Sequence, residues 1–503
     1  MHRVSLSKAG KRQTDDLFFS STDPALNRSL QRRAKEGALT RVGPGVYVES
    51  GGEAEIIGKI HRNWQRIASH AVPGAVVSHL SAFAGGITPS NEVVLSHPTR
   101  FNRRIRYPGL TLVLTKGPAP QPGDLRLGSL ELYWASQERA LLENLSRGSA
   151  TTRATRDAVE ERLITCLNAN KESGLNQIRD RARALTEPLG ATASYAALNG
   201  LIGALLSTHS KGVLKTKAGL AIAQGTPIDM ERIYLFNTLA TALRTAILPD
   251  IADVAAQGNT RIYFAFLESY FSNYVEGTRF SVEEAEGIVL RNQIVVQRPK
   301  DSHDILGVFN LAYKTETRAA VPPVGDDFVD VLQELHRVML ERRPEANPGH
   351  LKLEANYAGT TQFVEPSHVR GTLAEGSRLA LTIPEGMGRA IYYLFLVAEV
   401  HPFADGNGRL SRLVMNSELS RCGRSRIIIP TLFHPQFVDC LRALTQGGRP
   451  QPLIQALSRM GSWCATFDYT EITDVVVAMR NANAFEESAA DFRLLNADGS
   501  RAA

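Results

Sequence analysis

Residues 401–412 gather an imidazole, a carboxylate, an amide, two glycines and two guanidiniums into one short stretch. Within it, Gly406, Asn407 and Gly408 come just before apolar residues at helical spacing, which predicts that a helix begins here. The first turn of a helix has unpaired backbone N–H groups and the positive end of the helix dipole, and both attract anions. The stretch therefore predicts an anion site.

Two arginines, a carboxylate and a histidine give this site its chemistry. Arg409 and Arg412 lie one helical turn apart, so both guanidiniums can reach the same polyphosphate. Asp405 would be repelled by that polyphosphate unless a cation bridged them, and Mg²⁺ held by one carboxylate plus phosphate oxygens fits. His401 is then placed as a general base. The alternative is an ordinary turn between helices with two surface arginines.

The elements on either side can hold this stretch in place. Upstream, Pro384 precedes an apolar run over 386–398, which predicts a buried helix that ends near His401 and Pro402. Downstream, apolar residues recur at helical spacing as far as Gly423. We therefore expect a helix, a glycine-bearing loop and a second helix.

The spacing His-x-Phe-x-Asp-Gly-Asn-Gly-Arg-x-x-Arg fixes eight positions, which is too specific for a chance interhelical turn. It resembles the full signature of Fic domain proteins, which are typically protein adenylyltransferases. The resemblance implies that His401 deprotonates a hydroxyl of a target protein, which attacks the α-phosphate of ATP and expels pyrophosphate. It also implies that Asp405 holds Mg²⁺ between the α- and β-phosphates.

The same resemblance implies the remaining ATP contacts. The backbone of Gly406 and Gly408, with Asn407, would form an anion hole, and Arg409 and Arg412 would clamp the β- and γ-phosphates. A different reaction, transfer of a bare phosphoryl group, occurs in the Doc relatives. Gly408 argues against it, because the relatives that do this carry Lys at that position.

A second motif precedes this stretch in the chain. A helical pattern that begins near Asn259 ends with Ser272, Glu276 and Gly277. Because Glu276 lies where the helix dipole disfavours a negative charge, we expect a cation beside it. In the Fic family such a motif is an inhibitory helix, so the resemblance implies that Glu276 holds Arg412 away from the γ-phosphate. Glu276 could instead orient a water that removes AMP.

A short hairpin is predicted between the two motifs. Tyr357, Gly359, Thr360 and Phe363 lie in a run that indicates two strands around the glycine. In Fic proteins this flap pairs with an extended segment of the target, which is recognition by strand addition. The alternative is an ordinary surface hairpin.

The N-terminal part of the chain is basic. Residues 1–150 carry 20 Lys+Arg against 12 Asp+Glu, whereas the remainder carries 37 against 39. A helical pattern after Pro24 is followed by a strand, a tight turn and a strand over 39–48, which suggests the wing portion of a winged helix. Nucleic acid is the partner that this charge favours. The candidate DNA contacts are Arg28, Arg32, Arg33 and Arg41.

Residues 27–147 also resemble the AbiEi family of antitoxins and regulators, which implies a transcriptional role. The motifs that carry the resemblance are Leu30-x-Arg32-Arg33, Gly45-Val46-Tyr47, Ser78-His79-Leu80-Ser81-Ala82 and Glu138-Arg139-Ala140-Leu141-Leu142.

The composition excludes several classes of protein. The chain has 503 residues, of which 43% are apolar and 21% charged, as in ordinary globular domains. The longest apolar run is about half of a ~20-residue membrane span, and residues 1–12 lack the apolar core of a signal peptide, so we expect a cytoplasmic protein. The four cysteines show no metal-binding spacing.

We therefore expect a multidomain protein. A mostly α-helical Fic fold with a β-hairpin flap should follow a winged-helix and mixed α/β domain. The expected domains are a winged-helix-like DNA-binding region at 1–55, a mixed α/β AbiEi-like domain at 56–150, a helical connector at 151–225, a Fic domain with its inhibitory helix at 226–475, and a polar tail at 476–503.

The expected function is transfer of AMP from ATP, with Mg²⁺, to a Ser, Thr or Tyr hydroxyl of a protein, restrained by Glu276. The alternative is a DNA-binding regulator or antitoxin-like protein whose Fic pocket senses nucleotide. The expected partners are ATP, a protein substrate with a hydroxyl side chain, and DNA at the N-terminal region, with no membrane. Whether the chain is its own substrate is left open. A homodimer is left open.

Overall fold

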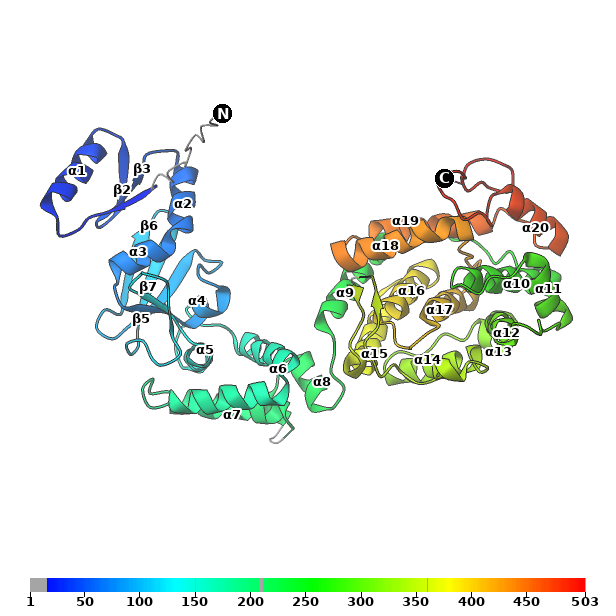
Figure 1. Cartoon of the computed structure of the whole chain (residues 1–503), viewed down its shortest axis with the longest axis horizontal. Coiled ribbons are helices and arrows are strands. Elements are labelled where there is room, and N and C mark those ends of the chain that lie inside the picture. Colours follow the sequence, from blue (N-terminus) through cyan, green and yellow to red (C-terminus); the bar gives the residue numbers. More distant parts are fainter. Residues whose placement is uncertain (1–15, 150, 208–210, 360, 503) are drawn as a thin grey trace, which may run out of the picture. The chain divides into compact units, whose positions relative to one another are not determined.

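The computed structural model describes residues 16–149, 151–207, 211–359 and 361–502. The chain divides into two compact units, 1–223 and 224–503, each of which is described by itself (Figure 1). None of the helices in these described ranges is long and apolar enough to cross a membrane.

The first unit begins with a small antiparallel sheet of order β1-β3-β2, with one helix beside it. Leu30 of the helix packs on Leu39 and Tyr47 of the sheet. Over the described residues up to 52, this is a single helix beside a hairpin, so the winged helix stays a prediction. The elements are β1 (Leu17–Phe19), α1 (Pro24–Lys35), β2 (Leu39–Gly43) and β3 (Val46–Glu49).

A six-stranded mixed sheet of order β6-β7-β5-β4-β9-β8 follows. The β5–β7 and β4–β9 pairs are parallel and the other pairs are antiparallel. Its elements are α2 (Glu53–Arg62), α3 (Trp64–Ala71), β4 (Ala75–Val77), α4 (His79–Ala84), β5 (Glu92–His97), β6 (Arg103–Tyr107), β7 (Leu110–Lys116), β8 (Leu125–Arg126), β9 (Leu132–Trp134) and α5 (Gln137–Leu145).

The rest of the first unit is helical. Its buried side chains form one core with Leu141 and Leu142 of α5, so the segment predicted as a connector packs on the domain before it. The elements are α6 (Arg156–Ala184), α7 (Thr192–Leu205), the 3₁₀ turn η1 (Lys211–Val213) and α8 (Lys217–Ala223).

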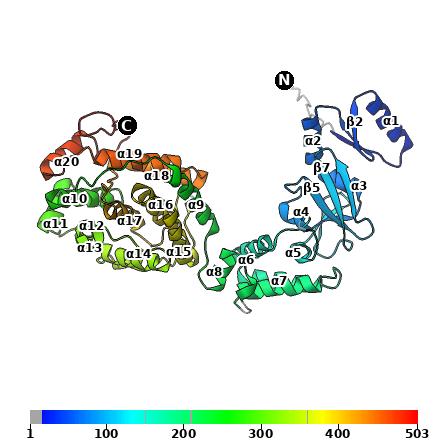
Figure 2. The same cartoon turned by 180° about the vertical axis from the view of Figure 1, so that it is seen from behind.

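The second unit is mostly helical and has one continuous core. Figures 1 and 2 show α16 and α17 side by side in its interior. Its helices are α9 (Met230–Thr245), α10 (Gly258–Tyr274), α11 (Val282–Arg291), α12 (Pro299–Tyr313), α13 (Thr315–Arg318), α14 (Asp326–Met339), α15 (Val369–Leu379), α16 (Met387–Val400), α17 (Asn407–Arg421), α18 (His434–Gly447), α19 (Gln451–Cys464) and α20 (Ile472–Asn481). The shorter elements are η2 (Pro344–Ala346), β10 (Tyr357–Ala358), β11 (Thr361–Gln362), η3 (Pro366–His368), η4 (Ala380–Thr382) and η5 (Thr431–Phe433).

The C-terminal segment differs from the polar tail that the sequence predicts from residue 476. After α20 ends at Asn481, the chain folds back onto the helical core, and Ala484 is fully buried. The Phe485 ring packs on two aromatic rings of α10, and Trp463 donates a hydrogen bond to the Leu495 carbonyl. The apolar residues of this segment are few and unevenly spaced among polar ones, so they show no periodicity that predicts burial.

Candidate active site

The expected helix, loop and helix are present, since α16 ends at Val400 and α17 begins at Asn407. His401 adopts the left-handed conformation (φ 53°) that ends α16. Gly406 caps α17 with φ 79°, and a Cβ there would lie 2.9 Å from the Leu340 side chain. A glycine is therefore required at this turn, for both its conformation and its space.

Side-chain bonds hold the loop between the two helices. The Asn407 side chain accepts from the Phe403 N–H and donates to the Phe403 carbonyl, each at 2.9 Å, and Asn356 donates to that carbonyl at 3.1 Å. His336 donates from Nε2 to the Asp405 carbonyl at 3.0 Å. The amide side chain of Asn407 is thus occupied by the loop, so its backbone is what faces an anion at the start of α17.

The His401 ring is held in one orientation. Its Nδ1 lies 3.2 Å from the Ala398 carbonyl, and the Phe363 ring stacks on it with centroids 3.9 Å apart and planes 9° apart. A carbonyl only accepts, so Nδ1 carries the proton and Nε2 keeps its lone pair. Burial lowers the pKa of His401 to about 4, against the bond to Ala398 and helped by the charge of Lys352. The imidazole is therefore neutral at pH 7 and can accept a proton.

The Arg409 guanidinium is buried in a polar network. Nη1 lies 3.2 Å from Asp304 Oδ2 and 3.4 Å from Asn273 Oδ1, and Nη2 lies 3.2 Å from Asp405 Oδ2. The Asp304 carboxylate is itself paired with Arg343 at 2.7 Å. Arg409 is thus fixed beside Asp405, whose side chain is 60% exposed.

Arg412 and Glu276 form the expected ion pair, with Nη2 2.7 Å from Oε1. Ser272 binds the same guanidinium twice, through its hydroxyl to Nε and its carbonyl to Nη2, both at 3.0 Å. Burial opposes ionisation of Glu276, but the guanidinium outweighs it, so the pKa of this carboxyl is lower than usual. The carboxylate therefore stays charged at pH 7. Gly277, with φ 96°, ends the turn that presents it.

Glu276 also lies against the start of α17. A Cβ added to Gly408 would come within 2.1 Å of Glu276 Oε1, so only a glycine leaves room for this carboxylate. Glu276 therefore places its negative charge at the helix N-terminus, where the sequence predicts that an anion binds.

The predicted hairpin is present, although its Thr360 lies outside the described residues. Tyr357 pairs with Gln362 across two short antiparallel strands, and Gly359 has φ 60° at the turn. Tyr357 is 60% exposed. The hairpin is two strands wide and leads into Phe363, which covers His401, and on β11 the Gln362 carbonyl accepts a hydrogen bond from Arg232 at 2.6 Å.

A buried lysine ties the base of this hairpin to the end of α16. Lys352 Nζ donates to Asn356 Oδ1 at 2.6 Å and to the Val400 carbonyl at 3.4 Å. Burial lowers the pKa of Lys352 to about 8. The lysine thus couples the hairpin to the residue before His401.

The donor set for a metal is small. Within the described ranges, no group of three or more His, Cys, Asp or Glu side chains is arranged to hold an ion. Asp405 offers one exposed carboxylate near the start of α17. A single carboxylate is a common protein ligand of Mg²⁺ when phosphate oxygens and waters supply the rest. The residues present fit Mg²⁺ that is bound together with a nucleotide.

The candidate DNA-binding residues lie in the first unit, on α1 and β2. Arg28, Arg32 and Arg41 are exposed, and Arg32 faces Glu36 at 3.8 Å. The Arg33 guanidinium lies 4.7 Å from the centre of the Phe18 ring. Three of the four guanidiniums are thus open to solvent.

Three residues that support the site could not be predicted from the motif itself. Asn273 and Asp304 position Arg409, and His336 stacks on Phe403 with centroids 3.9 Å apart. The helical spacing of Phe328, Leu332, His336 and Met339 could have indicated that His336 is buried. The partners of Asn273 and Asp304 lie more than a hundred residues away, and no local pattern reveals them.

Comparison with known proteins agrees with this geometry. Residues 328–419 match the Fic/DOC family. Protein adenylyltransferase Fic of Drosophila persimilis is 27% identical over 225 residues, which are 44% of this chain and 43% of that protein. Protein adenylyltransferase fic-1 of Caenorhabditis elegans is 25% identical over 188 residues, 36% of this chain and 37% of that protein. The match thus spans less than half of these curated relatives.

Among solved structures, Fic-1 from C. elegans aligns with 64% of this chain and 92% of its own, at 18% identity and a TM-score of 0.34. The family match places its signature on α14 to α17, the elements that carry His401 and Arg412. The second unit of this chain therefore contains a region, residues 328–419, that matches the Fic/DOC family.

Proposed function

We propose that this protein is an adenylyltransferase that moves AMP from ATP to a Ser, Thr or Tyr hydroxyl of a protein. The observation that carries the proposal is the buried His401, whose Nδ1 faces the Ala398 carbonyl so that Nε2 keeps its lone pair, in the loop that leads to the start of α17. Its relatives in this region are named protein adenylyltransferases, at 25–27% identity.

The chemistry follows from these positions. The triphosphate binds at the N-terminus of α17, where backbone N–H groups and the guanidiniums of Arg409 and Arg412 meet it. The target hydroxyl gives its proton to His401 Nε2 as its oxygen bonds to the α-phosphorus. The bond from that phosphorus to the bridging oxygen breaks, and pyrophosphate leaves. Mg²⁺, held by Asp405 and phosphate oxygens, would supply positive charge for the leaving group.

The hairpin supports a way of holding the target. An extended target segment would add to the β10–β11 edge by main-chain hydrogen bonds, with Tyr357 and Phe363 on either side of the hydroxyl to be modified. This arrangement selects an exposed, extended segment of a protein.

Glu276 restrains this reaction. It holds Arg412 and places its own charge against Gly408, so a γ-phosphate would meet a carboxylate there. Replacing Glu276 by Gly should raise the rate by roughly 5- to 150-fold, the usual range of coupling between sites. The same ionised carboxylate is suited to orient a water that removes AMP, and in that case wild type releases AMP from a modified target while Glu276→Gly does not.

Labelled ATP tests the reaction class. With the label on the α-phosphate, Glu276→Gly should label a protein, and wild type should do so weakly. With the label on the γ-phosphate, no protein should be labelled. Glu341→Gly, an exposed acid in the same unit, is the matched control and should behave as wild type. Protein labelling from the γ-position alone would overturn AMP transfer in favour of phosphoryl transfer.

A second candidate is a DNA-binding regulator of the AbiEi type, in which the Fic domain senses nucleotide. It is favoured by the excess of Lys and Arg in residues 1–150 and by the exposed Arg28, Arg32 and Arg41. Binding of duplex DNA that weakens with salt, with a slope that falls by about one in Arg32→Ala, would support it. Equal DNA affinity of wild type and this variant would show that Arg32 does not contact DNA.

A further inference from the structure

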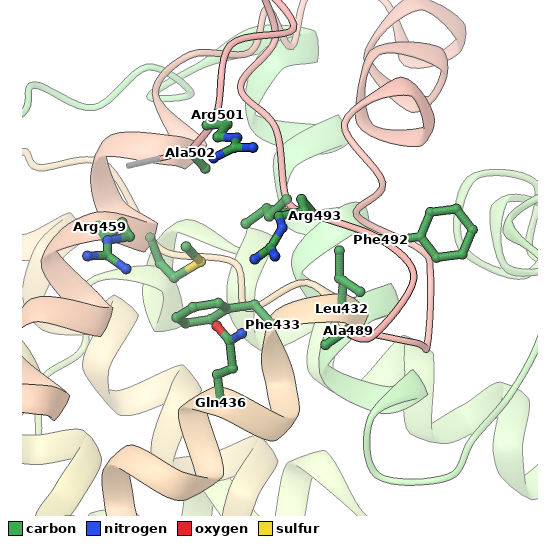
Figure 3. Close-up of a pocket in the computed structure, with 11 residues that line it drawn as sticks. Leu432, Phe433, Gln436, Arg459, Ala489, Phe492, Arg493, Arg501 and Ala502 are labelled. Atoms are coloured by element: carbon green, nitrogen blue, oxygen red, sulfur yellow. The ribbon is translucent and has the colours of Figure 1, made fainter.

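One cavity in the second unit is lined by three arginines. It has a volume of about 260 Å³ and lies between η5, α18, α19 and the C-terminal segment. Arg459 comes from α19, whereas Arg493 and Arg501 come from the segment after α20. Figure 3 shows Arg493 above Phe433, with Arg459 to its left and Arg501 above it. The cavity contains none of the residues of the Fic motif.

Within the described residues, no carboxylate forms an ion pair with these three guanidiniums. Most arginines elsewhere in the described second unit pair with a carboxylate, such as Arg442 with Asp439 at 3.1 Å and Arg480 with Glu283 at 2.5 Å. In contrast, no side chain of the described residues forms an ion pair or hydrogen bond with the guanidinium of Arg459, Arg493 or Arg501, and all three residues are exposed. Like charges that are gathered in one place repel one another, and an anion between them would relieve the repulsion.

Hydrogen bonds hold the backbone of the C-terminal segment at two of the three arginines. The Arg493 carbonyl accepts a hydrogen bond from Asn483 at 2.7 Å, and the Arg501 carbonyl accepts one from Asn496 at 3.2 Å. Leu495 and Arg501 also form a backbone bridge. The loop that carries Arg493 and Arg501 is therefore hydrogen-bonded, and both residues are exposed beside the cavity that Arg459 also lines.

The size and the lining of the cavity indicate the ligand. Its volume lies below the roughly 300–1,000 Å³ of pockets for drug-sized molecules, so the ligand is small. Guanidinium forks match phosphate oxygens in two-pronged bonds, and three of them favour more than one negative charge. The rings of Phe433 and Phe492 also line the cavity, and Figure 3 shows that Phe492 points away from the arginines.

We propose that this cavity binds a small phosphate-bearing anion at a site separate from the Fic motif. The ligand joins the C-terminal segment to α19 and neutralises the three guanidiniums. It therefore raises the Tm of the protein by mass action, because it binds only the folded segment. Binding weakens as salt is added, since all three arginines are exposed.

Calorimetry with pyrophosphate and with inorganic phosphate tests this site in the full chain. The comparison uses wild type, Arg459→Ala, Arg493→Ala and the double variant, with Arg442→Ala as a control that removes an arginine outside the cavity. The Fic loop is unchanged in all of them, so differences in binding report the arginine cavity. Each single variant should weaken the cavity's binding by about tenfold, and the double variant should abolish it.

The variant Arg493→Lys tests whether weaker binding comes from the lost guanidinium or from a loss of folding. It keeps the charge but not the fork, so it should bind pyrophosphate more weakly than wild type and more tightly than Arg493→Ala. The Tm in phosphate-free buffer should match wild type, and added pyrophosphate should raise it less than in wild type. Equal pyrophosphate affinity and stoichiometry in wild type, Arg493→Lys and both single alanine variants would overturn the proposal.

Discussion

His401 combines two constraints that act on one ring. The bond from Nδ1 to Ala398 selects the tautomer, and the stacked Phe363 helps to bury the ring. Together with Lys352 this burial keeps the pKa far below 6.5. The base is therefore available over the whole physiological pH range.

Removing Phe363 should move the pH dependence of the reaction. In Phe363→Ala, solvent reaches His401, so its pKa rises from about 4 toward 6.5. The reaction needs the neutral ring. On acidification, the rate of the variant should therefore begin to fall at a higher pH than the rate of the protein that keeps Phe363. The measurement is a pH–rate profile in the Glu276→Gly background. Tyr357→Ala should leave the acid limb unchanged, and an unmoved limb in Phe363→Ala would show that the stack does not set this pKa.

His336 makes the stability of the loop depend on pH. Burial lowers its pKa to about 4 in the folded state, so the unfolded chain binds more protons between pH 4 and 6.5. The free energy of unfolding should therefore be greatest above pH 6.5 and fall on acidification, by up to roughly 3 kcal/mol from this residue. His336→Gln should be less stable at pH 7 and should lose less stability below pH 6.5, as measured by urea unfolding. Parallel pH curves for the two proteins would contradict this role.

The motif residues could be predicted because their chemistry and spacing are local. The eight fixed positions around Asp405 indicate a base, a cation ligand and phosphate contacts from the amino-acid sequence alone. The helix dipole predicted a cation beside Glu276, and the resemblance to Fic proteins implied that this cation is Arg412, as the ion pair shows. Asn273, Asp304 and the double contact of Ser272 could not, because only the packing of α10 and α12 against α17 brings them together.

At the level of elements, the C-terminal segment supports the turn that carries Glu276. The Phe485 ring lies with its centroid 4.8 Å from that of Phe271 on α10. The Tyr274 hydroxyl binds Glu487 at 2.9 Å, and Arg279 binds the same carboxylate at 3.2 Å. Contacts therefore lie on both sides of Glu276 in the chain.

Loss of this support should loosen the restraint. Phe485→Ala removes the packing on α10, so the proposed inhibitory turn should release Arg412 more often and labelling by α-tagged ATP should rise several-fold. Val477→Ala, an exposed apolar truncation on α20, is the control. A variant that stays folded, as judged by Tm, and labels at the wild-type rate would show that the segment does not support the restraint.

The helices α16 and α17 could be predicted, the first from its continuous apolar run and the second from apolar residues at helical spacing, and both are buried on nearly all sides. The hairpin at Gly359 followed from its turn residue. In contrast, the fold of residues 482–502 depends on a few scattered apolar side chains and on backbone hydrogen bonds to distant parts of the domain. Neither produces a periodic pattern in the sequence.

At the scale of the whole molecule, the residues proposed for catalysis and restraint belong to one compact unit. His401, Arg412 and Glu276 all lie in residues 224–503, whereas the excess of positive charge lies in residues 1–150. The chain thus separates the candidate enzyme from the candidate DNA-binding region.

A fragment of residues 224–503 should therefore fold, keep low basal labelling, and respond to Glu276→Gly as the full chain does. Residues 1–223 should carry any affinity for DNA. The measurements are thermal unfolding, labelling with α-tagged ATP and DNA titration of each fragment. A fragment that folds but labels at the rate of the Glu276→Gly variant would show that the first unit contributes to the restraint.

The most direct measurement is tandem mass spectrometry of proteins incubated with ATP and Mg²⁺, using Glu276→Gly with and without His401→Ala. The account predicts an added AMP on a Ser, Thr or Tyr side chain with the first protein, and a yield about 100- to 10,000-fold lower when His401 is also replaced. An added AMP at equal yield with both proteins, or none with either, would contradict it.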